Sequence, residues 1–128
     1  MKKIATDLAP AAIGPYSQGV VVDENQKMIY VSGQLPVDPK TGQFVEGDIQ
    51  ALTTRVIDNI EAILIAAGSR LDKVIRTDVF LLDLKEFSKV NEIYAKRFKG
   101  DPLPVRQTIQ VAGLPMNSPI EISCIAIG

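Results

Sequence analysis

Residues 48–68 read DIQALTTRVIDNIEAILIAAG, and residues 74–82 read VIRTDVFLL. In the first stretch apolar residues recur every three or four positions, which predicts an amphipathic helix packed against a core. Asp48 is its expected N-cap, and Gly68 is the expected stop after its last turn. The second stretch is rich in β-branched residues and alternates poorly, as a strand buried on both faces does. A helix followed by a buried strand indicates an α/β fold.

The chain beyond residue 82 continues this alternation. Asp83 and Glu86 have the spacing of a capping box, and the apolar stripe after them predicts a second helix that ends near Phe98. Residues 105–111 and 120–127 are two further strands, joined by a loop that contains two prolines and a glycine. We expect these two strands to form a hairpin.

The chain before residue 48 consists of short β-rich runs and turns. Residues 3–6 are an expected first strand, and residues 19–23 and 27–32 are an expected hairpin with its turn at Glu24-Asn25-Gln26. Residues 37–47 are an expected loop. The order β-β-β-α-β-α-β-β, within one domain of residues 1–128, predicts a mixed sheet with both helices packed on one face. A second copy of the chain is the simplest cover for the other face.

The composition narrows the class of protein. The chain has 46% hydrophobic residues, and its 14 basic and 15 acidic residues form no long run of one sign. This argues against nucleic acid or an anionic membrane as a partner. The longest apolar stretch, residues 62–67, is too short to span a bilayer, and the first residues lack the apolar segment of a signal peptide.

Histidine is absent, and Cys124 is the single cysteine. These facts exclude a histidine-based nucleophilic triad, a histidine-ligated zinc and an intrachain disulfide. Because Ile122 and Ala126 flank Cys124 on its face of a strand, we expect an inert core thiol. A chain without disulfides fits a reducing compartment, which here means the cytoplasm. Its chemistry is expected to use no metal and no cofactor.

The last two strands place chemically useful residues together if they pair as a hairpin. Arg106 and Thr108 share one face of the first strand, and Glu121 shares a face of the second with Ser123. Pairing centred near Leu114 and Pro115 would put Thr108 opposite Glu121 and Arg106 opposite Ser123. A guanidinium suited to bind a carboxylate and a carboxylate able to position water would then share one face. The alternative is an Arg–Glu ion pair at a sheet edge or subunit interface.

Other polar residues have ordinary structural explanations. Asn91 lies beside the apolar stripe of the second helix and is expected where the buried face of that helix meets its exposed face. Tyr16 is a loop aromatic that is expected to pack. Ser32 and Gly33 end a strand in an expected turn, although glycine there lets a ligand approach the backbone.

Several stretches resemble the RidA (YjgF-like) family. The chain spans this family from end to end, and the stretches occur in the family's order: Ala9–Gly19 (APAAIGPYSQG), Val31–Pro36 (VSGQLP), Val90–Tyr94 (VNEIY), Leu103–Thr108 (LPVRQT) and Ile120–Ile122 (IEI). The resemblance implies a chorismate-mutase-like α/β fold and a homotrimer with three clefts between subunits. It also implies hydrolysis of the enamine and imine products of pyridoxal-phosphate-dependent dehydratases, with release of ammonia.

The resemblance assigns roles to individual residues. Arg106 matches the arginine that binds the substrate carboxylate, and Glu121 matches the acidic residue that positions the attacking water. The positions that line or support the cleft are matched by Tyr16, Ser32, Gly33, Asn91 and Thr108. Many imine-deaminating members carry cysteine where this chain has Thr108, so the departure bears on whether that side chain or only its backbone acts.

Three functions fit these observations. The first is hydrolysis of 2-iminobutanoate or 2-iminopropanoate to the 2-oxo acid. The second is a non-catalytic module in which the same cleft senses a 2-oxo acid and regulates a partner. The third is RNA cleavage or inhibition of translation, a function also attached to the family, which the absence of histidine and of a basic stripe disfavours.

Overall fold

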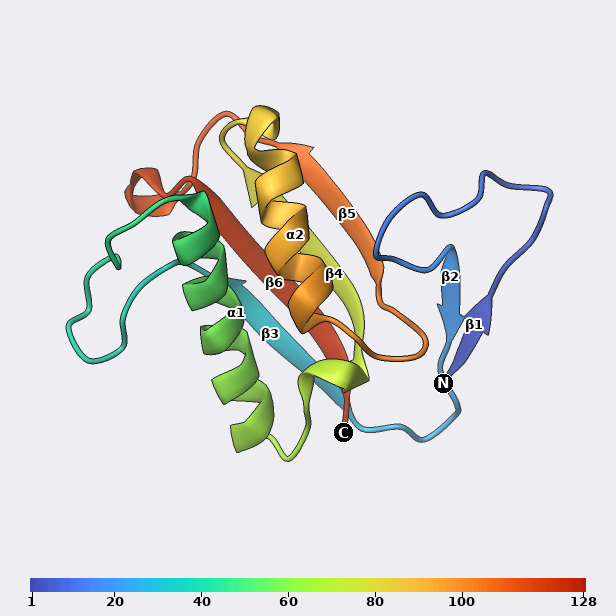
Figure 1. The fold of residues 1–128 in the computed structure, drawn as a ribbon. Helices are drawn as coiled ribbons and strands as arrows, with labels where there is room; N and C mark the ends of the chain where they lie inside the picture. The colour runs from blue at the N-terminus through green and yellow to red at the C-terminus, as the bar shows by residue number, and fades with distance from the viewer.

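The computed structural model describes residues 1–128 as two layers, a four-stranded sheet with two helices on one face (Figure 1). The strand order in the sheet is β3-β6-β4-β5, and β1 and β2 form a separate two-stranded sheet. The strands are β1 (Lys2–Ile4), β2 (Gly19–Val21), β3 (Met28–Gln34), β4 (Val74–Leu81), β5 (Val105–Gln110) and β6 (Ile120–Ile127). The helices are α1 (Ile49–Ala66) and α2 (Phe87–Arg97), with short 3₁₀ turns at Leu71–Lys73, Leu84–Glu86 and Pro115–Asn117.

Both predicted helices are confirmed, with the start and stop signals of the first. Asp48 Oδ1 accepts a hydrogen bond from the backbone N–H of Ala51 at 2.9 Å, which caps α1. Gly68 follows the last turn with a φ of +78°, a conformation that glycine adopts without a steric penalty. At the second helix Asp83 caps the 3₁₀ turn by accepting from Lys85 N–H, so α2 itself begins four residues later, at Phe87.

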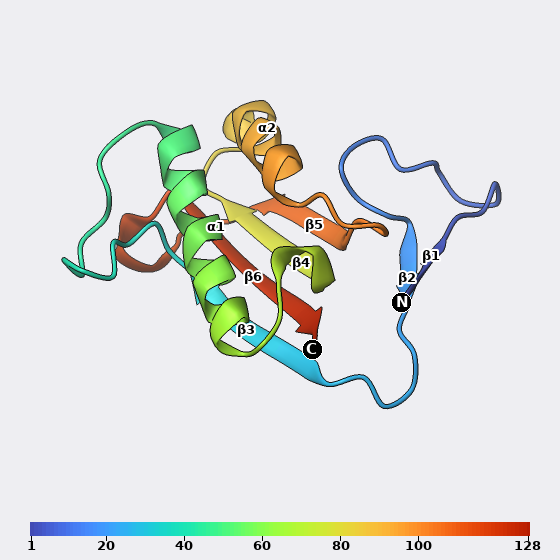
Figure 2. The ribbon, with the colours of Figure 1, turned by 60° about the horizontal axis from the view of Figure 1, so that its bottom comes forward.

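The expected hairpin between residues 19–23 and 27–32 is wrong. β2 pairs with β1, and β3 pairs with β6 in the main sheet. Alternate residues of β3, Ile29 and Val31, are buried in the core, so this strand has to lie against the helices. Its two neighbours in sequence, β1 and β2, lie beside the sheet rather than in it (Figure 2).

The expected hairpin of the last two strands is also wrong. β5 runs parallel to β4 after the crossover through α2, and β6 lies on the other side of β4, antiparallel to it. Burial explains this order, because one face of β6 is completely enclosed whereas β5 is half-buried or exposed along its length. A strand with a fully buried face is most stable in the middle of a sheet, and a polar strand at the edge.

The core lies between the sheet and the helices. It consists of side chains from α1, α2 and the helix-facing side of the sheet, including Val56, Ile60, Val79 and Ile122. The opposite face of the sheet is open (Figure 2). β4 is therefore buried on one face and not on both, because Arg76 is exposed and Asp78 and Phe80 are half-buried on the open side. No helix has both the length and the apolar character needed to cross a membrane.

Candidate active site

Arg106 lies on edge strand β5, on the face that packs against α2. It pairs in register with Thr77 of β4, which is fully buried. Its Nη1 donates a hydrogen bond of 2.7 Å to Oδ1 of Asn91, and this is the side chain's single protein hydrogen bond. Guanidinium has five N–H donors, so most of them remain available to a ligand. Asn91, expected at the edge of the apolar stripe of the second helix, is the partner that holds the arginine.

Three aromatic rings surround the Arg106 guanidinium. Its Cζ lies 4.6 Å from the ring centroid of Tyr94, 5.5 Å from that of Phe87 and 5.7 Å from that of Tyr16. These distances are within the range of cation–π attraction. Burial lowers the pKa of Arg106 below its ordinary value, whereas Tyr94 and Tyr16 act to raise it. The arginine stays charged, since an arginine pKa begins far above neutrality.

The partner of Arg106 distinguishes it from most arginines of the chain. Arg70, Arg76 and Arg97 each form an ion pair with at least one carboxylate. Arg106 has no carboxylate within 4 Å and donates a hydrogen bond to a side-chain amide instead. Arg55 on α1 is similar, since its Nε donates to the side-chain amide of Asn59. A half-buried guanidinium without a counter-ion is suited to bind an anion that arrives from outside.

Glu121 lies on the open face of the sheet, where β6 is flanked by β3 and β4. It pairs in register with Phe80 and is half-buried. A Cβ on Gly33 would lie 2.7 Å from Glu121 Cδ, so the carboxylate occupies space that any other residue at position 33 would fill. This close contact gives Gly33 a structural role. Ser32 next to it is exposed.

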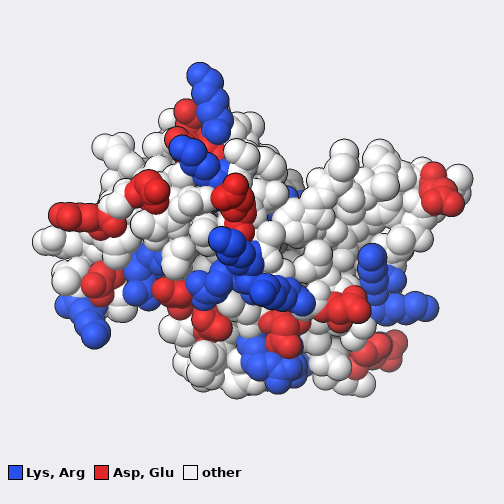
Figure 3. All heavy atoms as spheres, in the orientation of Figure 1, with Lys and Arg blue, Asp and Glu red and all other residues white.

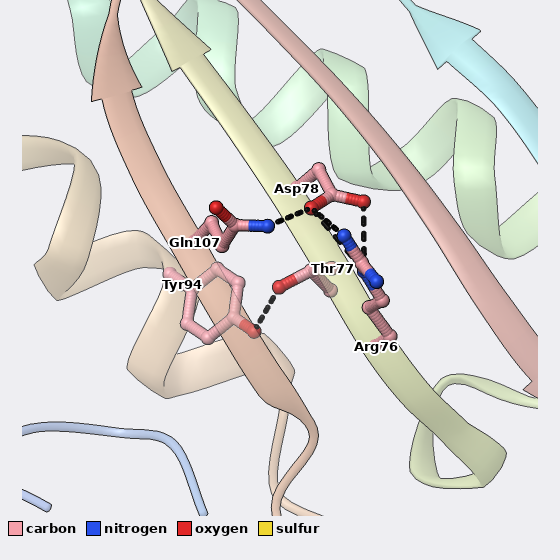
Figure 4. Close-up of polar contacts among 5 residues, drawn as sticks. All are labelled: Arg76, Thr77, Asp78, Tyr94 and Gln107. Carbon is pink, nitrogen blue, oxygen red and sulfur yellow. Dashed lines mark hydrogen bonds and ion pairs between the residues drawn. The ribbon is translucent and has the colours of Figure 1, made fainter.

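A polar network occupies the same open face. Arg76 forms an ion pair with Asp78 at 3.0 Å, and Gln107 donates to Asp78 from β5 (Figure 4). The carboxylate of Glu121 is not part of this network and has no ion-pair partner within the subunit. Glu121 is therefore free to interact with water or with a group from another molecule.

The structure places Arg106 and Glu121 on opposite faces of the sheet, contrary to the predicted hairpin. β4 lies between their strands, and Arg106 is level with Cys124, three residues along β6 from Glu121. Each of these two offsets is about 10 Å, from the spacing of strands and the rise per residue. One small molecule cannot touch both side chains of the same subunit.

Thr108 lies on the helix side with Arg106, as the alternation of β5 predicted. Its Oγ1 is the one buried side-chain nitrogen or oxygen without a hydrogen-bond partner. Thr108 pairs in register with Val79, so its surroundings include apolar core. The hydroxyl does not hold Arg106 or any other part of the subunit in place.

Cys124 is the buried, inert thiol that was expected. Only 2% of the residue is exposed, and burial raises its pKa to about 12. A thiol with this pKa is almost wholly protonated at neutral pH and is a poor nucleophile.

The remaining surface has no single-sign patch in view and no metal-binding cluster. Lysine and arginine alternate with aspartate and glutamate over the face shown in Figure 3. No three histidine, cysteine, aspartate or glutamate side chains lie close enough together to hold a metal ion. The cavities of the subunit lie elsewhere, and the largest two are lined by other residues than Arg106 and Glu121.

Three residues around Arg106 were not anticipated as parts of a site. Phe87 and Tyr94 belong to the apolar stripe that predicted the second helix, and Thr77 to the strand predicted over residues 74–82. The spacing of Phe87, Asn91 and Tyr94, at four and three residues, puts them on one helix face and was a usable signal. This spacing does not tell which strand packs against the helix face, and only the strand order of the sheet shows that it is the strand of Arg106.

Comparisons with known proteins identify relatives along the whole chain. Residues 6–128 match the family described as Endoribonuclease L-PSP. A mouse protein named 2-iminobutanoate/2-iminopropanoate deaminase is 47% identical over 126 residues, which cover 98% of this chain and 90% of the mouse protein.

Two solved structures are similar in fold as well as sequence. The YjgF gene product of E. coli has a TM-score of 0.73 and 43% identity, covering 99% of this chain and 98% of its own. E. coli TdcF, solved with bound serine, has a TM-score of 0.73 and 40% identity, covering 100% of this chain and 99% of its own.

Proposed function

The chain belongs to the RidA (YjgF-like) family, and we propose that it hydrolyses reactive 2-imino acids such as 2-iminobutanoate and 2-iminopropanoate to 2-oxo acids and ammonia. The observation that carries this proposal is the half-buried Arg106 guanidinium, which Asn91 and aromatic rings hold in place and which no carboxylate of the subunit neutralises. The mouse relative named as a deaminase of these two imino acids supports the substrate class.

Arg106 anchors the carboxylate that every 2-imino acid carries. A planar guanidinium binds a carboxylate through two parallel N–H···O bonds, which fixes both the position and the plane of a small substrate. Asn91 leaves donors on Arg106 free for this purpose. TdcF, solved with serine, supports such a site, since serine is also a small molecule with a carboxylate next to a nitrogen-bearing carbon.

Glu121 directs the attacking water, and it does so from a neighbouring subunit. The two charged groups lie on opposite faces of one sheet, so a substrate held by Arg106 has to meet the Glu121 of another copy. That carboxylate accepts a proton from water as the water oxygen attacks the imine carbon. Glu121 passes this proton to the imine nitrogen, and the second water proton follows as the carbon–nitrogen bond breaks, so ammonia leaves, the 2-oxo acid remains and Glu121 is again a carboxylate.

The other proposed site residues support these two groups. Tyr16 flanks the guanidinium from the N-terminal loop, and Gly33 leaves room for the Glu121 carboxylate. Ser32 is exposed beside Gly33 and able to contact substrate. Thr108 contributes through its backbone on the Arg106 side. The reaction needs only positioning of substrate and water, which by itself accelerates such steps strongly.

We propose self-association because apolar surface remains uncovered on the single subunit, and the family resemblance makes the assembly a homotrimer. Leu8 and Ile13 of the N-terminal loop are 98% and 91% exposed, and Tyr30 and Ile109 on the open sheet face are 73% and 43% exposed. Monomeric proteins rarely leave patches of large apolar side chains in water. Assembly through the open face would cover Tyr30 and Ile109 and bring Glu121 to a second chain.

The test is an imine-hydrolysis assay in which a dehydratase supplies 2-iminobutanoate from threonine. The parent should accelerate loss of the imine, and Arg106→Lys should lower kcat/KM about hundredfold, since lysine keeps the charge but cannot bind both carboxylate oxygens in the same way. Arg55→Lys is the matched control, because Arg55 also bonds only an amide and should leave turnover unchanged. Near-normal activity of Arg106→Lys would contradict the anchoring role.

Two further measurements separate the alternatives. Light scattering at micromolar concentration should report three chains, and an active monomer would exclude a site shared between subunits. A parent that binds 2-oxobutanoate without hydrolysing imines would favour a sensing module. Cleavage of single-stranded RNA that survives Arg106→Lys would favour the activity in the family's description.

A further inference from the structure

Tyr94 lies directly against the guanidinium of Arg106. Its ring centroid is 4.6 Å from Arg106 Cζ, closer than the rings of Phe87 and Tyr16. Tyr94 is completely buried, so it does not reach a ligand itself. It forms the floor on which the guanidinium rests.

The hydroxyl of Tyr94 is bonded to the sheet, and its ring packs against a second aromatic ring. Its hydroxyl bonds to Oγ1 of Thr77 at 2.8 Å (Figure 4), and its ring stacks on Phe98 with centroids 4.4 Å apart and a 30° angle between planes. Thr77 is also fully buried, and it pairs in register with Arg106 across the β4–β5 ladder. The hydroxyl of Tyr94 is therefore tied to the point of the sheet from which Arg106 projects.

Core packing alone does not account for a tyrosine and a threonine at these positions. Phenylalanine and valine have nearly the same shapes and would bury no polar atoms, whereas two buried hydroxyls have to satisfy each other. What the pair adds is a fixed tilt of the ring. The attraction between a cation and an aromatic ring depends on the ring's face pointing at the cation, and it is strongest away from water.

We propose that Thr77 and Tyr94 form a positioning pair that orients the Arg106 guanidinium for its ligand. The hydrogen bond sets the tilt of the Tyr94 ring, the ring sets the plane of the guanidinium, and Asn91 sets its rotation in that plane. The consequence for carboxylate binding rests on the proposed function. The effect on Arg106 itself does not, so the two can fail separately.

The primary test compares Tyr94→Leu with Phe98→Leu in the full chain. Both variants remove a fully buried ring from the same cluster, but Phe98 stacks on Tyr94 without facing Arg106 and takes no part in the Thr77–Tyr94 hydrogen bond. The readouts are the order parameter of the Arg106 Nε–H bond by ¹⁵N relaxation, the affinity for 2-oxobutanoate by calorimetry, and the Tm.

Tyr94→Leu should lower the Arg106 order parameter from the rigid to the flexible range, from about 0.85 to below about 0.6. It should also weaken 2-oxobutanoate binding about tenfold. Phe98→Leu should lower the Tm by a similar amount and leave both other readouts near the parent's. A rigid Arg106 in Tyr94→Leu, or equal loosening in Phe98→Leu, would overturn the proposal.

A second test separates the hydrogen bond from stability. The double variant Thr77→Val/Tyr94→Phe removes both hydroxyls, so it leaves no buried polar atom unpaired and should recover most of the Tm lost by either single change. If the bond orients the ring, the double variant should still show a loosened Arg106 and an affinity about threefold weaker than the parent's. Recovery of all three readouts together would reduce the pair to a structural role.

The same data distinguish this proposal from the proposed function. A parent that neither binds 2-oxobutanoate nor hydrolyses imines, but whose Arg106 loosens in Tyr94→Leu, would refute the function and support the positioning pair. Binding and turnover that persist with a rigid Arg106 in Tyr94→Leu would do the reverse.

Discussion

Arg106 and Glu121 carry the two charges of the proposed site, and the subunit surrounds them very differently. Arg106 is enclosed between α2, the N-terminal loop and β4. It donates a hydrogen bond of 2.7 Å to the side-chain amide of Asn91, and three aromatic ring centroids lie within 6 Å of its guanidinium carbon. Glu121 lies on an open sheet face without an ion-pair partner, and its carboxylate occupies the space that a side chain at position 33 would fill. Under the proposed function, one chain would complete the anchoring half of the site, and the water-directing half would depend on a second chain.

Because the two groups have such different surroundings, substrate binding and the chemical step should respond to different substitutions. Substitutions around Arg106 should affect affinity for any 2-oxo or 2-imino acid, because the anchor acts in the ground state as well as in the transition state. Substitutions around Glu121 should affect turnover and spare affinity.

Glu121→Gln should lower kcat about hundredfold, because an amide of the same shape cannot accept a proton from water. The affinity for 2-oxobutanoate should stay within about twofold of the parent's. Steady-state kinetics and calorimetry on the same preparation give both values. A parallel loss of affinity and turnover would mean that Glu121 belongs to the anchor and that the two halves are not separate.

Gly33→Ala should lower kcat about tenfold without changing affinity. The added Cβ would lie 2.7 Å from Glu121 Cδ and 2.8 Å from its Oε1, so the carboxylate has to swing away. Gly113→Ala is the matched control, since a Cβ there meets nothing within 4 Å. Equal activity of the two alanine variants would show that the position of the Glu121 carboxylate does not matter.

The anchoring half should make the fold sensitive to alkali. Burial raises the pKa of Tyr94 from 10.0 to about 12, so the folded state keeps a proton that the unfolded state loses first. The stabilisation is complete below pH 10 and is lost as pH rises toward 12, at about 1.4 kcal/mol per pH unit. Denaturant unfolding gives the free energy of unfolding at each pH. Between pH 10 and 12 this free energy should fall more steeply for the parent than for Tyr94→Phe.

That alkaline experiment has one competing group. Cys124 is also buried, and its pKa of about 12 is likewise raised from an ordinary 9.0, so it destabilises the fold with the same sign as pH rises. Both curves contain this contribution, so their difference reports Tyr94 together with its interactions with Cys124 and Arg106. Parallel curves from pH 10 to 12 would show that Tyr94 ionises as easily in the folded chain as in the unfolded one.

Thr108→Cys should have the smallest effect, with turnover and affinity within about twofold of the parent's. The Thr108 hydroxyl has no hydrogen-bond partner in the subunit, so its replacement breaks no bond. Removing an unpaired buried hydroxyl costs nothing and stabilises the fold by up to about 1 kcal/mol. A severalfold gain in turnover would instead mean that a thiol at this position takes part in the reaction.

Much of the fold was predictable because its signals are local. The apolar period of residues 48–68, the Asp48 cap and Gly68 all act within a few residues, and the structure confirms them. Alternation also placed Arg106 and Thr108 together on one face of β5, and Cys124 in the core, since successive side chains of a strand point to opposite sides.

The candidate site was less predictable because it depends on which strands are neighbours. The hairpin assumed for the last two strands put Arg106 and Glu121 on one face, whereas β4 separates them. The sequence did contain a signal, because the strand with the apolar Ile122 suits the centre of a sheet and the strand with the polar Gln107 suits its edge. This signal depends on comparing all strands of the sheet, whereas the short loop between these two strands favours the simpler expectation of a hairpin.

The sequence was enough to identify the helices and strands, the face of its element on which each residue lies, and the RidA family. The contacts of Asn91 and Tyr94 with Arg106, and the orientation of Glu121 away from Arg106, are visible only in the folded chain. The cause is the range of the interactions that set each feature. Helix and strand periodicity arise from bonds between residues close in the chain, whereas strand order follows from burying the most apolar strand, β6, at the centre of the sheet.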